Sequence, residues 1–321
     1  MTFDGFLVVD KPPGVTSHDI VAVVRAVTGL KKVGHTGTLD PFATGVLPLA
    51  LGGATRLIGF LDESLKVYDA TVQLGSATDT GDPTGATVAT APVPVLRRAE
   101  VERVLATFVG ERDQMPPRYS AVKVAGRPLY SYARAGQEVE VRSRRITIRE
   151  IELLELGEER LRIRIRCGRG TYARVIAEEL GVALGTVGHL AELRREGSGS
   201  FTLENSVSMS RLALIVAESP DWVNVLRLSR REERVPWRDR ESIFRGLQPF
   251  RLPPRAVLGH LPSLTLSSIE ARRFVQTGAP PGAPRDPQQA LLLIEGSEVL
   301  GVLPAGGLRA VVLAREAAPS A

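Results

Sequence analysis

Residues 67–74 and 161–167 alternate between apolar and polar side chains along almost their whole length. The apolar positions are Tyr68, Ala70, Val72 and Leu74 in the first segment, and Leu161, Ile163, Ile165 and Cys167 in the second. Successive side chains of a β-strand point to opposite faces of its sheet, so both segments are predicted to be strands with one buried face. Tyr68 is predicted to point inward, towards a core or a pocket, and a core tyrosine is the simpler of these alternatives.

An apolar stripe at helical spacing runs from Ile20 to Val27 and predicts a helix. Thr16 and Asp19 have the spacing of a capping box at its start, and Gly29 marks its end. Further helices are predicted over residues 54–65, 99–110, 129–136, 171–180 and 268–277. Further strands are predicted over residues 6–10, 46–51, 290–294, 298–303 and 309–314.

Other stretches have no clear period. Residues 76–94 are rich in Thr, Gly, Asp and Pro and are predicted to be loop, and 111–126 is predicted to be irregular. We interpret residues 76–136 as an inserted subdomain. Residues 189–195 fit a helix or a strand equally well. Residues 227–255 are charged and contain proline, and we interpret them as a linker or an insertion.

The charge of the chain is unevenly distributed. Its 321 residues, enough for two domains, carry a net charge of +5, which is compatible with nucleic-acid binding. Between Arg142 and Arg174 there are ten arginines and five glutamates. This basic strip would suit a phosphate backbone, and a solvated strand face is the alternative.

The composition limits the class of protein. One cysteine, Cys167, excludes an internal disulfide and predicts a reducing compartment. No apolar stretch is long enough to span a bilayer, and the first residues lack the pattern of a secretory signal. The four histidines have no metal-ligand spacing with the cysteine or with each other. We therefore expect a cytoplasmic protein without a metal.

One carboxylate has an unusual setting. Asp40 follows Gly34 and Gly37 and precedes Pro41, which disfavours the helical region for the residue before it. The apolar run 46–51 then predicts a rigid wall behind this loop. The loop could present an acid to a ligand, and an ordinary turn aspartate is the alternative.

Arg174 is predicted to lie in the first turn of the helix over 171–180, which Gly181 is predicted to end. The helix dipole disfavours a cation at this end of a helix. A residue that is locally unfavourable and has no evident stabilising role often has a functional one. The alternative is a solvated arginine whose long side chain reaches away from the helix.

Several separated motifs extend over roughly the first two hundred residues. In chain order they are Lys11-Pro-Pro-Gly-Val-Thr-Ser17, Gly34-His-Thr-Gly-Thr-Leu-Asp-Pro-Phe-Ala-Thr-Gly45, Lys66-Val-Tyr68, Gly170-Thr-Tyr-Ala-Arg174 and Leu193-Arg-Arg195. Together they resemble the motifs of the bacterial tRNA pseudouridine-55 synthase family of the TruB type. The resemblance implies isomerisation of uridine 55 in the T-loop of tRNA to pseudouridine, by a monomer without a cofactor or metal.

The resemblance also implies roles for individual residues. Asp40 matches the catalytic aspartate, which either attacks the sugar or assists elimination to a glycal. Arg174 would pair with this carboxylate and keep it charged. Tyr68 would stack on the uracil and could serve the later removal of a proton from carbon. Tyr172 and Leu193 match positions that line the base pocket.

The remaining implied contacts are with RNA. A base inside a folded T-loop must be extruded before it can react, at a cost of a few kcal/mol. His35 matches a loop that contacts the RNA where bases have been displaced, with a turn histidine as the alternative. Lys11 and Lys123 match basic positions near the active cleft or the RNA-gripping insertion.

The implied fold is α+β, a pseudouridine synthase core with a mixed, mainly antiparallel sheet and a small β-rich PUA-like domain at the C-terminus. Residues 1–258 would form the catalytic domain, with the RNA-gripping insertion at about 76–136, and residues 259–321 the PUA-like domain. Residues 227–255 do not follow the family pattern.

Three other functions fit part of the sequence. A guide-RNA-dependent, dyskerin-like synthase shares the Asp40 loop, but the long section 76–136 resembles the insertion of the stand-alone bacterial enzymes. A tRNA-binding chaperone would need no catalysis. A glycosidase would need a second carboxylate facing the same bond, and Asp79 and Asp82 are expected only to shape their loop.

Overall fold

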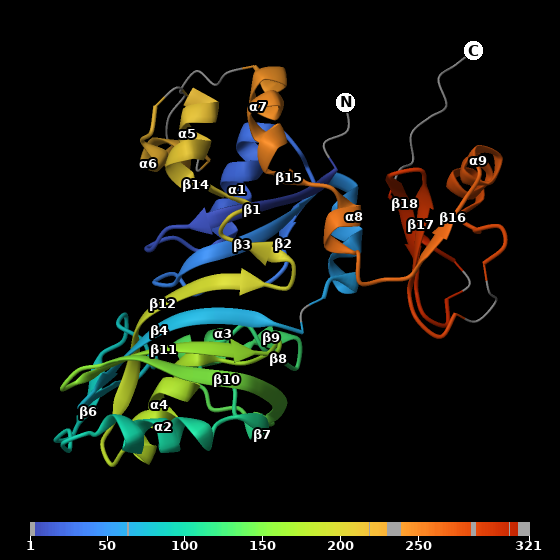
Figure 1. Cartoon of the computed structure of the whole chain (residues 1–321). Coiled ribbons are helices and arrows are strands. Elements are labelled where there is room, and N and C mark those ends of the chain that lie inside the picture. Colours follow the sequence, from blue (N-terminus) through green and yellow to red (C-terminus); the bar gives the residue numbers. More distant parts are fainter. Residues whose placement is uncertain are drawn as a thin grey trace. The chain divides into compact units, whose positions relative to one another are not determined.

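The structure is a computed structural model and describes residues 4–62, 64–217, 219–229, 239–283, 287–307 and 309–313 (Figure 1). The chain divides into two compact units, each discontinuous in sequence. Unit 1 comprises Met1–Asp40, Val46–Asp62 and Ser200–Ala321, and unit 2 comprises Pro41–Gly45 and Glu63–Gly199.

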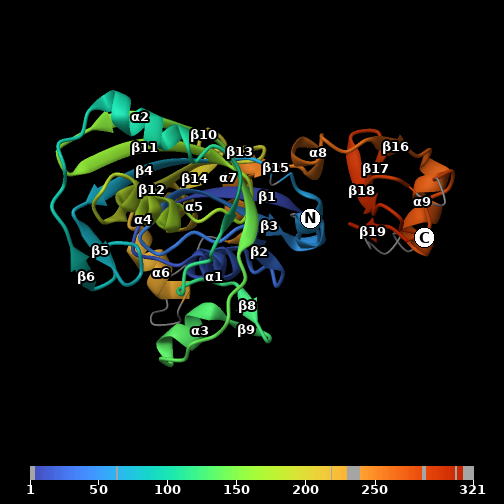
Figure 2. The same ribbon diagram turned by 90° about the horizontal axis from the view of Figure 1, so that it is seen from below.

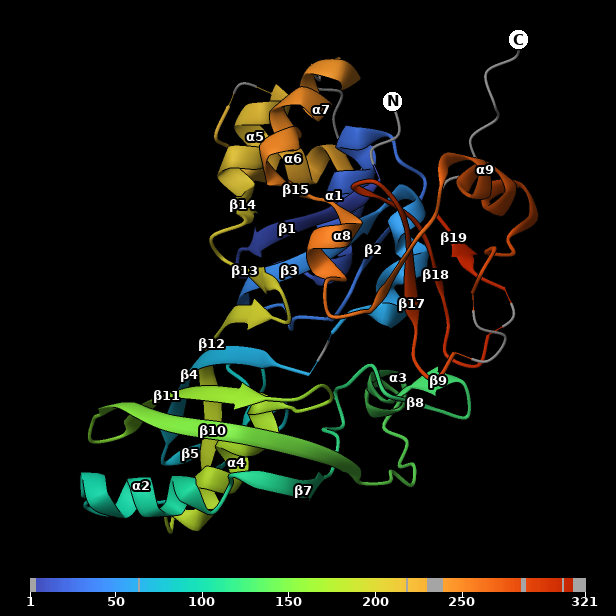
Figure 3. The ribbon, with the colours of Figure 1, turned by 45° about the vertical axis from the view of Figure 1, so that its right-hand side comes forward.

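Unit 2 is built on an antiparallel sheet. Its strands, in spatial order, are β12 (Gly188–Ser198), β4 (Lys66–Leu74), β11 (Arg160–Cys167), β10 (Arg144–Leu156) and β7 (Gly110–Gln114) (Figure 3). The first residues of β3, Thr44 and Gly45, pair in parallel with Arg194 and Arg195 of β12.

The two alternating segments form the centre of this sheet. In β4 every second residue from Tyr68 to Leu74 is buried, and β11 buries Leu161, Ile163, Ile165 and Cys167. Tyr68 lies opposite Ile165 on one side and Arg195 on the other. The inward orientation predicted for Tyr68 is confirmed, because only 8% of the residue is exposed.

Two helices pack against the sheet of unit 2. Helix α4 (Ala173–Ala183) contacts β12 and β4, and α2 (Arg98–Ala106) contacts β10. The prediction that Gly181 ends α4 is wrong. A Cβ at Gly181 would lie 2.7 Å from the carbonyl carbon of Val187, so this glycine permits close packing. The left-handed residue after the helix is Gly185, with φ +81°.

The predicted loops of unit 2 contain short strands. Residues 76–94 include the hairpin of β5 (Ser76–Thr78) and β6 (Thr87–Thr90), and 111–126 includes most of β7. The strand β7 is an edge strand with charged residues on both faces, so it lacks an alternating pattern. Strands β8 (Lys123–Val124) and β9 (Arg127–Pro128) lie beside α3 (Leu129–Arg134) (Figure 2).

Unit 1 begins with β1 (Gly5–Lys11) and α1 (Ser17–Thr28). The capping box is confirmed, since the hydroxyl of Thr16 accepts from the Asp19 N–H and the Asp19 carboxylate accepts from the Thr16 N–H. Gly29 caps the other end with φ +67°, as predicted.

In unit 1, β1 lies beside the later part of β3 (Thr44–Leu51), and short strands pair with both. The strands β14 (Ser206–Ser208) and β15 (Arg251–Leu252) pair with β1, and β2 (Val33–His35) pairs with β3. The segment predicted as a helix over 54–65 is a 3₁₀ helix, η1 (Gly52–Phe60). Leu61 begins an extended turn instead of a further helical turn.

Helices occupy most of residues 227–255, which the sequence predicted to be a linker or an insertion. In chain order, residues 201–257 of unit 1 include β13 (Phe201–Thr202), α5 (Met209–Ala217), α6 (Trp222–Ser229), α7 (Arg240–Leu247), η2 (Gln248–Phe250) and α8 (Pro254–Val257). Residues 230–238 of this stretch lie outside the described part of the chain. The side chain of Asp239 caps α7 by accepting from the Ser242 N–H.

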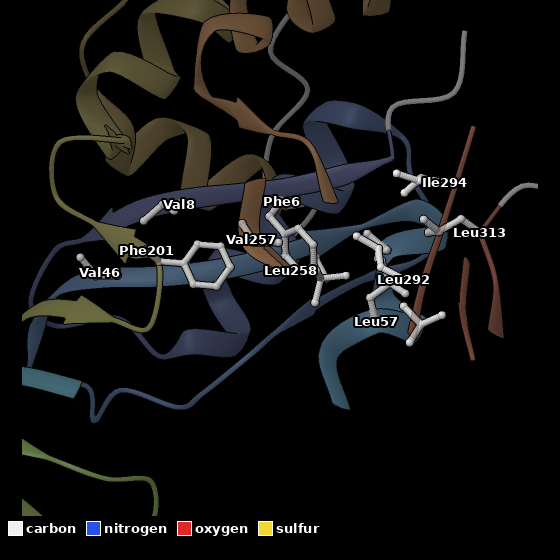
Figure 4. Close-up of a cluster of buried hydrophobic side chains, with 13 residues drawn as sticks. Phe6, Val8, Val46, Leu57, Phe201, Val257, Leu258, Leu292, Ile294 and Leu313 are labelled. Atoms are coloured by element: carbon white, nitrogen blue, oxygen red, sulfur yellow. The ribbon is translucent and has the colours of Figure 1, made fainter. Parts of the chain in front are cut away.

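The C-terminal residues of unit 1 form a second sheet. Its order is β16 (Ser263–Thr265), β17 (Leu291–Glu295), β18 (Glu298–Leu303) and β19 (Val311–Val312), and α9 (Ser268–Thr277) follows β16. The predicted helix over 268–277 and the strands over 290–294 and 298–303 are confirmed. Of the strand predicted over 309–314, only Val311–Val312 form a strand, and residue 314 lies outside the described part of the chain. A core formed by Phe6, Leu57, Leu292 and Val302, among others, joins this sheet to β1 and η1 (Figure 4).

The predicted α+β class with a mixed, mainly antiparallel sheet is confirmed. In the larger sheet two pairings, β1 with β14 and β3 with β12, are parallel, whereas the other registers described are antiparallel. Among the described residues, no helix combines the length and the apolar character that crossing a lipid bilayer requires.

Candidate active site

The start of α4 carries two of the predicted site residues. Tyr172 is the N-cap residue, with an extended backbone and no side-chain capping bond of its own. Arg174 follows as the second helical residue, in the first turn as predicted. Its side chain points into the protein, because the residue is only 3% exposed. The solvated arginine considered from the sequence is therefore wrong.

The guanidinium of Arg174 is held by backbone carbonyls and a carboxylate. Its Nη1 donates to the carbonyl of Thr80 at 2.8 Å, and its Nη2 donates to the carbonyl of Tyr119 at 2.9 Å. The Oδ2 of Asp82 lies 3.6 Å from Nη1. Carbonyl oxygens fix the direction of a guanidinium without cancelling its charge, so this arrangement orients a cation in a protected place.

The loop that contains Asp82 is tightly built. The Oδ1 of Asp82 accepts from the hydroxyl of Thr80 at 2.8 Å and from the Thr84 N–H at 3.0 Å, while Oδ2 faces Arg174. Gly81 has φ +70°, and a Cβ there would collide with the carboxylate of Glu178 on α4. Asp82 therefore shapes the loop, as predicted, and also faces Arg174, which the sequence did not reveal.

Two further carboxyl groups lie on α4 after Arg174. Burial raises the pKa of the Glu178 carboxyl, and the charge of Arg174 opposes this effect. Burial also raises the pKa of the neighbouring Glu179 carboxyl, and the charge of Arg112 opposes this effect. The Nη2 of Arg112 lies 2.7 Å from the Oε2 of Glu179. The first turns of α4 thus combine one buried cation with two partly buried acids.

Tyr68 and Leu193 occupy the same face of the β4–β12 pair. Leu193 lies opposite Ala70, which is two residues from Tyr68 on β4, and directly paired side chains of antiparallel strands share a face. Leu193, like Tyr68, is 8% exposed. The structure therefore brings an aromatic ring and an aliphatic side chain to one surface of unit 2.

Asp40 lies in unit 1, in irregular backbone between β2 and β3, and is partly exposed. The residue before it is fixed by Ser17, the first residue of α1. The Ser17 hydroxyl accepts from the Leu39 N–H at 2.9 Å and donates to the Leu39 carbonyl at 3.1 Å. Asp40 thus follows a firmly held residue, and its pairing with Arg174 stays a prediction.

Two other predicted contacts belong to unit 1. Lys11 is fully buried at the end of β1, and its Nζ donates to the carbonyls of Pro12 and Val15 at 2.9 and 2.7 Å. It therefore closes the Pro12–Val15 turn. His35 ends β2, and its ring meets that of His18 edge to face, with centroids 5.4 Å apart.

Lys123 lies on the exposed hairpin of β8 and β9 in unit 2. Arginines stack on tyrosines around it: Arg127 lies 4.7 Å from the ring centre of Tyr132, and Arg134 lies 5.5 Å from that of Tyr130. Positive charge and aromatic rings are thus concentrated on the β8–β9 hairpin and the helix α3 that follows it.

The basic strip predicted between Arg142 and Arg174 is largely neutralised on β11. The ion pairs join Arg162 to Asp69 and Glu155, Arg164 to Glu152 and Glu196, and Arg166 to Glu150, at distances between 2.8 and 3.5 Å. The solvated strand face, considered as the alternative, is the observed one.

Two family models match adjacent parts of the chain. The family model for the TruB family pseudouridylate synthase N-terminal domain matches residues 25–173. The model for the tRNA pseudouridylate synthase B C-terminal domain matches residues 174–227. The two matches meet at Tyr172–Arg174, the residues at the start of α4.

Relatives and solved structures extend the comparison. The chain is 44% identical to "tRNA pseudouridine synthase B" of Aromatoleum aromaticum over 87% of this chain and 83% of that protein. It is 50% identical to the protein of the same name from Geobacillus kaustophilus over 64% of this chain and 74% of the relative. The crystal structure of a Cbf5-Nop10-Gar1 complex contains a chain with a TM-score of 0.67 and 25% identity, over 96% of this chain and 80% of that one.

The fold and the matches define an RNA-modifying isomerase of the pseudouridine synthase class. Within this class, the chain belongs to the TruB family of pseudouridylate synthases. The family resemblance drawn from the sequence motifs is thereby confirmed.

Proposed function

We propose that this enzyme converts uridine 55 in the T-loop of tRNA to pseudouridine. The observation that carries the proposal is the buried guanidinium of Arg174, which two carbonyls and Asp82 hold at the start of α4. The relatives from Aromatoleum and Geobacillus support tRNA as the substrate through their names. The reaction breaks the N1–C1′ bond, forms a C5–C1′ bond and moves a proton from C5 to N1, so no co-reactant is consumed.

Asp40 is the proposed catalytic carboxylate. Either attack on C1′ or assistance to glycal formation requires it to be ionised beside the glycosidic bond. Arg174 would keep it ionised, since an adjacent cation lowers the pKa of an acid.

Tyr68, Leu193 and Tyr172 are the proposed walls of the base pocket. The shared face of Tyr68 and Leu193 supports this role, because a flipped pyrimidine needs one flat and one aliphatic surface. Tyr68 would stack on the uracil and is also the proposed acceptor for the proton that leaves C5. Tyr172 would approach the base from the start of α4.

RNA contacts are proposed for Lys123 and His35, whereas the contact expected for Lys11 from the sequence is replaced by a role inside the protein. The arginine and tyrosine side chains around Lys123 support a backbone contact at the β8–β9 hairpin, since cations and aromatic rings suit phosphates and unstacked bases. His35 would contact the displaced loop bases. Because Lys11 is buried and bonded to its own turn, its proposed role is to hold the backbone of the cleft.

The proposed domain organisation is a catalytic domain over 1–258, with the RNA-gripping insertion at about 76–136, and a PUA-like domain over 259–321. The separate four-stranded sheet β16–β19 supports the second domain. We further propose that the enzyme acts on the T-arm as a cytoplasmic monomer, without a metal or cofactor.

The test uses a tRNA transcript, purified enzyme and carbodiimide mapping of pseudouridine. The wild type should modify only the T-loop uridine, and Asp40→Asn should lose modification while binding tRNA normally. Asp113→Asn, which changes an exposed carboxylate on β7, is the matched control and should keep full activity. Full turnover by Asp40→Asn would contradict the role of this residue.

Two alternative functions remain distinguishable. A chaperone without essential catalysis would bind the transcript and leave it unmodified. A guide-dependent synthase would modify nothing until a guide RNA was added. The Cbf5-Nop10-Gar1 match gives this second alternative a structural basis, but its 25% identity is well below the 44% of the tRNA synthase relative.

A further inference from the structure

Gln114, the last residue of β7, bonds to both backbone groups of Tyr172. Its Oε1 accepts from the Tyr172 N–H at 2.8 Å, and its Nε2 donates to the Tyr172 carbonyl at 3.2 Å. The residue is 2% exposed, so water cannot easily replace either bond. A single buried side chain therefore fixes the peptide groups on both sides of one residue.

The start of α4 needs such a partner. A helix start leaves N–H groups without intrahelical acceptors, and a Ser, Thr, Asp or Asn at the N-cap usually satisfies one of them. Tyr172 cannot do so, and Val175, three residues later, cannot supply the returning carboxylate of a capping box. Gln114 accepts from the N-cap N–H in its place, although it lies 58 residues away along the chain.

The same segment also binds Arg174. Five residues after Gln114, the carbonyl of Tyr119 accepts from the Arg174 guanidinium. Pro116 and Pro117 lie between them and restrict the backbone of this connection, because a proline ring fixes φ. Residues 114–119, which we name the clasp, thus bind α4 at its N-cap and at its buried arginine.

We propose that Gln114 is a positioning residue for pseudouridine formation, acting through Tyr172 and Arg174. The proposal rests on the function proposed above for these two residues. Gln114 fixes the position and direction of the N-cap backbone, and the clasp fixes the guanidinium of Arg174. The guanidinium is thereby held in the orientation that the proposed pairing with the catalytic carboxylate requires. Errors of about 1 Å in such placement can lower a rate about 100-fold.

A purely structural role makes a different prediction. If Gln114 only stabilised the fold, its replacement would lower the melting temperature but leave the rate constant of the folded enzyme unchanged. A direct RNA contact would instead weaken tRNA binding. A positioning role lowers the rate constant for chemistry at saturating enzyme and leaves the affinity for tRNA nearly unchanged.

The experiment compares Gln114→Leu and Gln114→Glu with the wild type in single-turnover assays on a T-arm transcript. Leucine removes both bonds at similar volume, whereas glutamate keeps the acceptor for the Tyr172 N–H and loses the donor. We expect a rate about 10- to 100-fold lower for Gln114→Leu and an intermediate rate for Gln114→Glu, with Kd changed less than about threefold. Hydrogen exchange should be faster for peptides covering residues 171–175.

Two controls separate the possible outcomes. Gln248→Leu changes an exposed glutamine of η2 and should behave as the wild type. Arg174→Lys tests the proposed function itself: if this variant is fully active, that function of Arg174 fails whatever Gln114 does. If Arg174→Lys is inactive but both Gln114 variants keep the wild-type rate, or lose rate only in proportion to affinity, the positioning role is wrong. Should Gln114→Leu not fold, Gln114→Glu alone decides.

Discussion

Two sets of arginines in unit 2 use opposite kinds of partner. On β11, the side chains of Arg162, Arg164 and Arg166 are 32–46% exposed, and each faces one or two carboxylates. At the start of α4, Arg174 is almost fully buried and is bonded to two carbonyls, with Asp82 slightly farther away. The exposed arginines pair with carboxylates on a solvated face, whereas the buried one is bonded to backbone carbonyls in addition to facing a carboxylate.

The two settings differ in how strongly the surroundings screen the charge of the arginine. Exposed ion pairs contribute between about 0 and 1 kcal/mol each, because water and salt screen them. A buried cation interacts more strongly with any anion that approaches, since the surroundings screen it less. The basic strip noted in the sequence therefore includes on β11 three arginines whose charges lie in exposed, solvent-screened ion pairs.

The largest expected effect is that of Arg174→Lys. Lysine keeps the charge but cannot reproduce the planar fork that reaches the carbonyls of Thr80 and Tyr119 together. We expect the single-turnover rate of pseudouridine formation to fall at least about 100-fold, with tRNA binding retained. A rate within twofold of the wild type would show that the fork is dispensable.

Asp82→Asn should have the next largest effect on the rate. Asparagine can still accept from Thr80 and Thr84, but the oxygen facing Arg174 loses its charge or becomes an NH₂ group. We expect a rate reduced about 10-fold, with a change in unfolding free energy of about 1 to 3 kcal/mol. Asp79→Asn, in the same loop, is the matched control, and equal losses in both variants would argue for a loop effect alone.

A buried thiol at the end of β11 predicts a pH effect. Burial raises the pKa of Cys167 from 9.0 to about 11, against smaller lowering effects of Thr171 and Lys66. Since the pKa of the thiol is higher in the folded than in the unfolded protein, deprotonation of Cys167 favours unfolding. With respect to this group, the free energy of unfolding therefore keeps its full value below pH 9 and falls as the pH rises towards 11.

The measurement for Cys167 is urea unfolding below pH 9 and near pH 11. The wild type should lose on the order of 2 kcal/mol more than Cys167→Ala over this range, because alanine has no proton to release. Other groups titrate equally in both proteins and cancel in the difference. Parallel pH profiles of the two proteins would contradict the assignment.

The smallest expected effect is that of Arg164→Gln on β11. The change removes the ion pairs with Glu152 and Glu196 from a solvated face. The unfolding free energy should fall by less than about 1 kcal/mol, less still at high salt, and the modification rate should not change. A substantial loss of tRNA affinity would instead restore the basic strip as an RNA contact.

The sequence predicted the elements whose signals are local. The alternation in β4 and β11, the capping box of Thr16 and Asp19, and the C-terminal strands β17 and β18 were all correctly assigned. Each of these depends on residues a few positions apart. Gly181 was misread because a glycine needed for close contact with β12 looks the same in sequence as one that ends a helix.

The partners of the site residues were harder to predict. Arg174 was selected correctly, but Gln114 and Asp82 gave no sign of their bonds to α4, since these join residues 58 and 92 positions apart. The strand β7 was missed because its own residues have no alternating apolar pattern. It is a strand because it pairs with β10, which a single sequence does not reveal. Long-range side-chain bonds leave no period in a single sequence.

The chain crosses between the two units four times, at residues 40/41, 45/46, 62/63 and 199/200. Neither unit is a continuous fragment, and β3 has its first two residues in one unit and the rest in the other. Cutting the gene at any one of these points would leave both products incomplete. Deletion, circular permutation and domain-swap experiments on this enzyme must therefore move several segments together, and the first of them ends at Asp40.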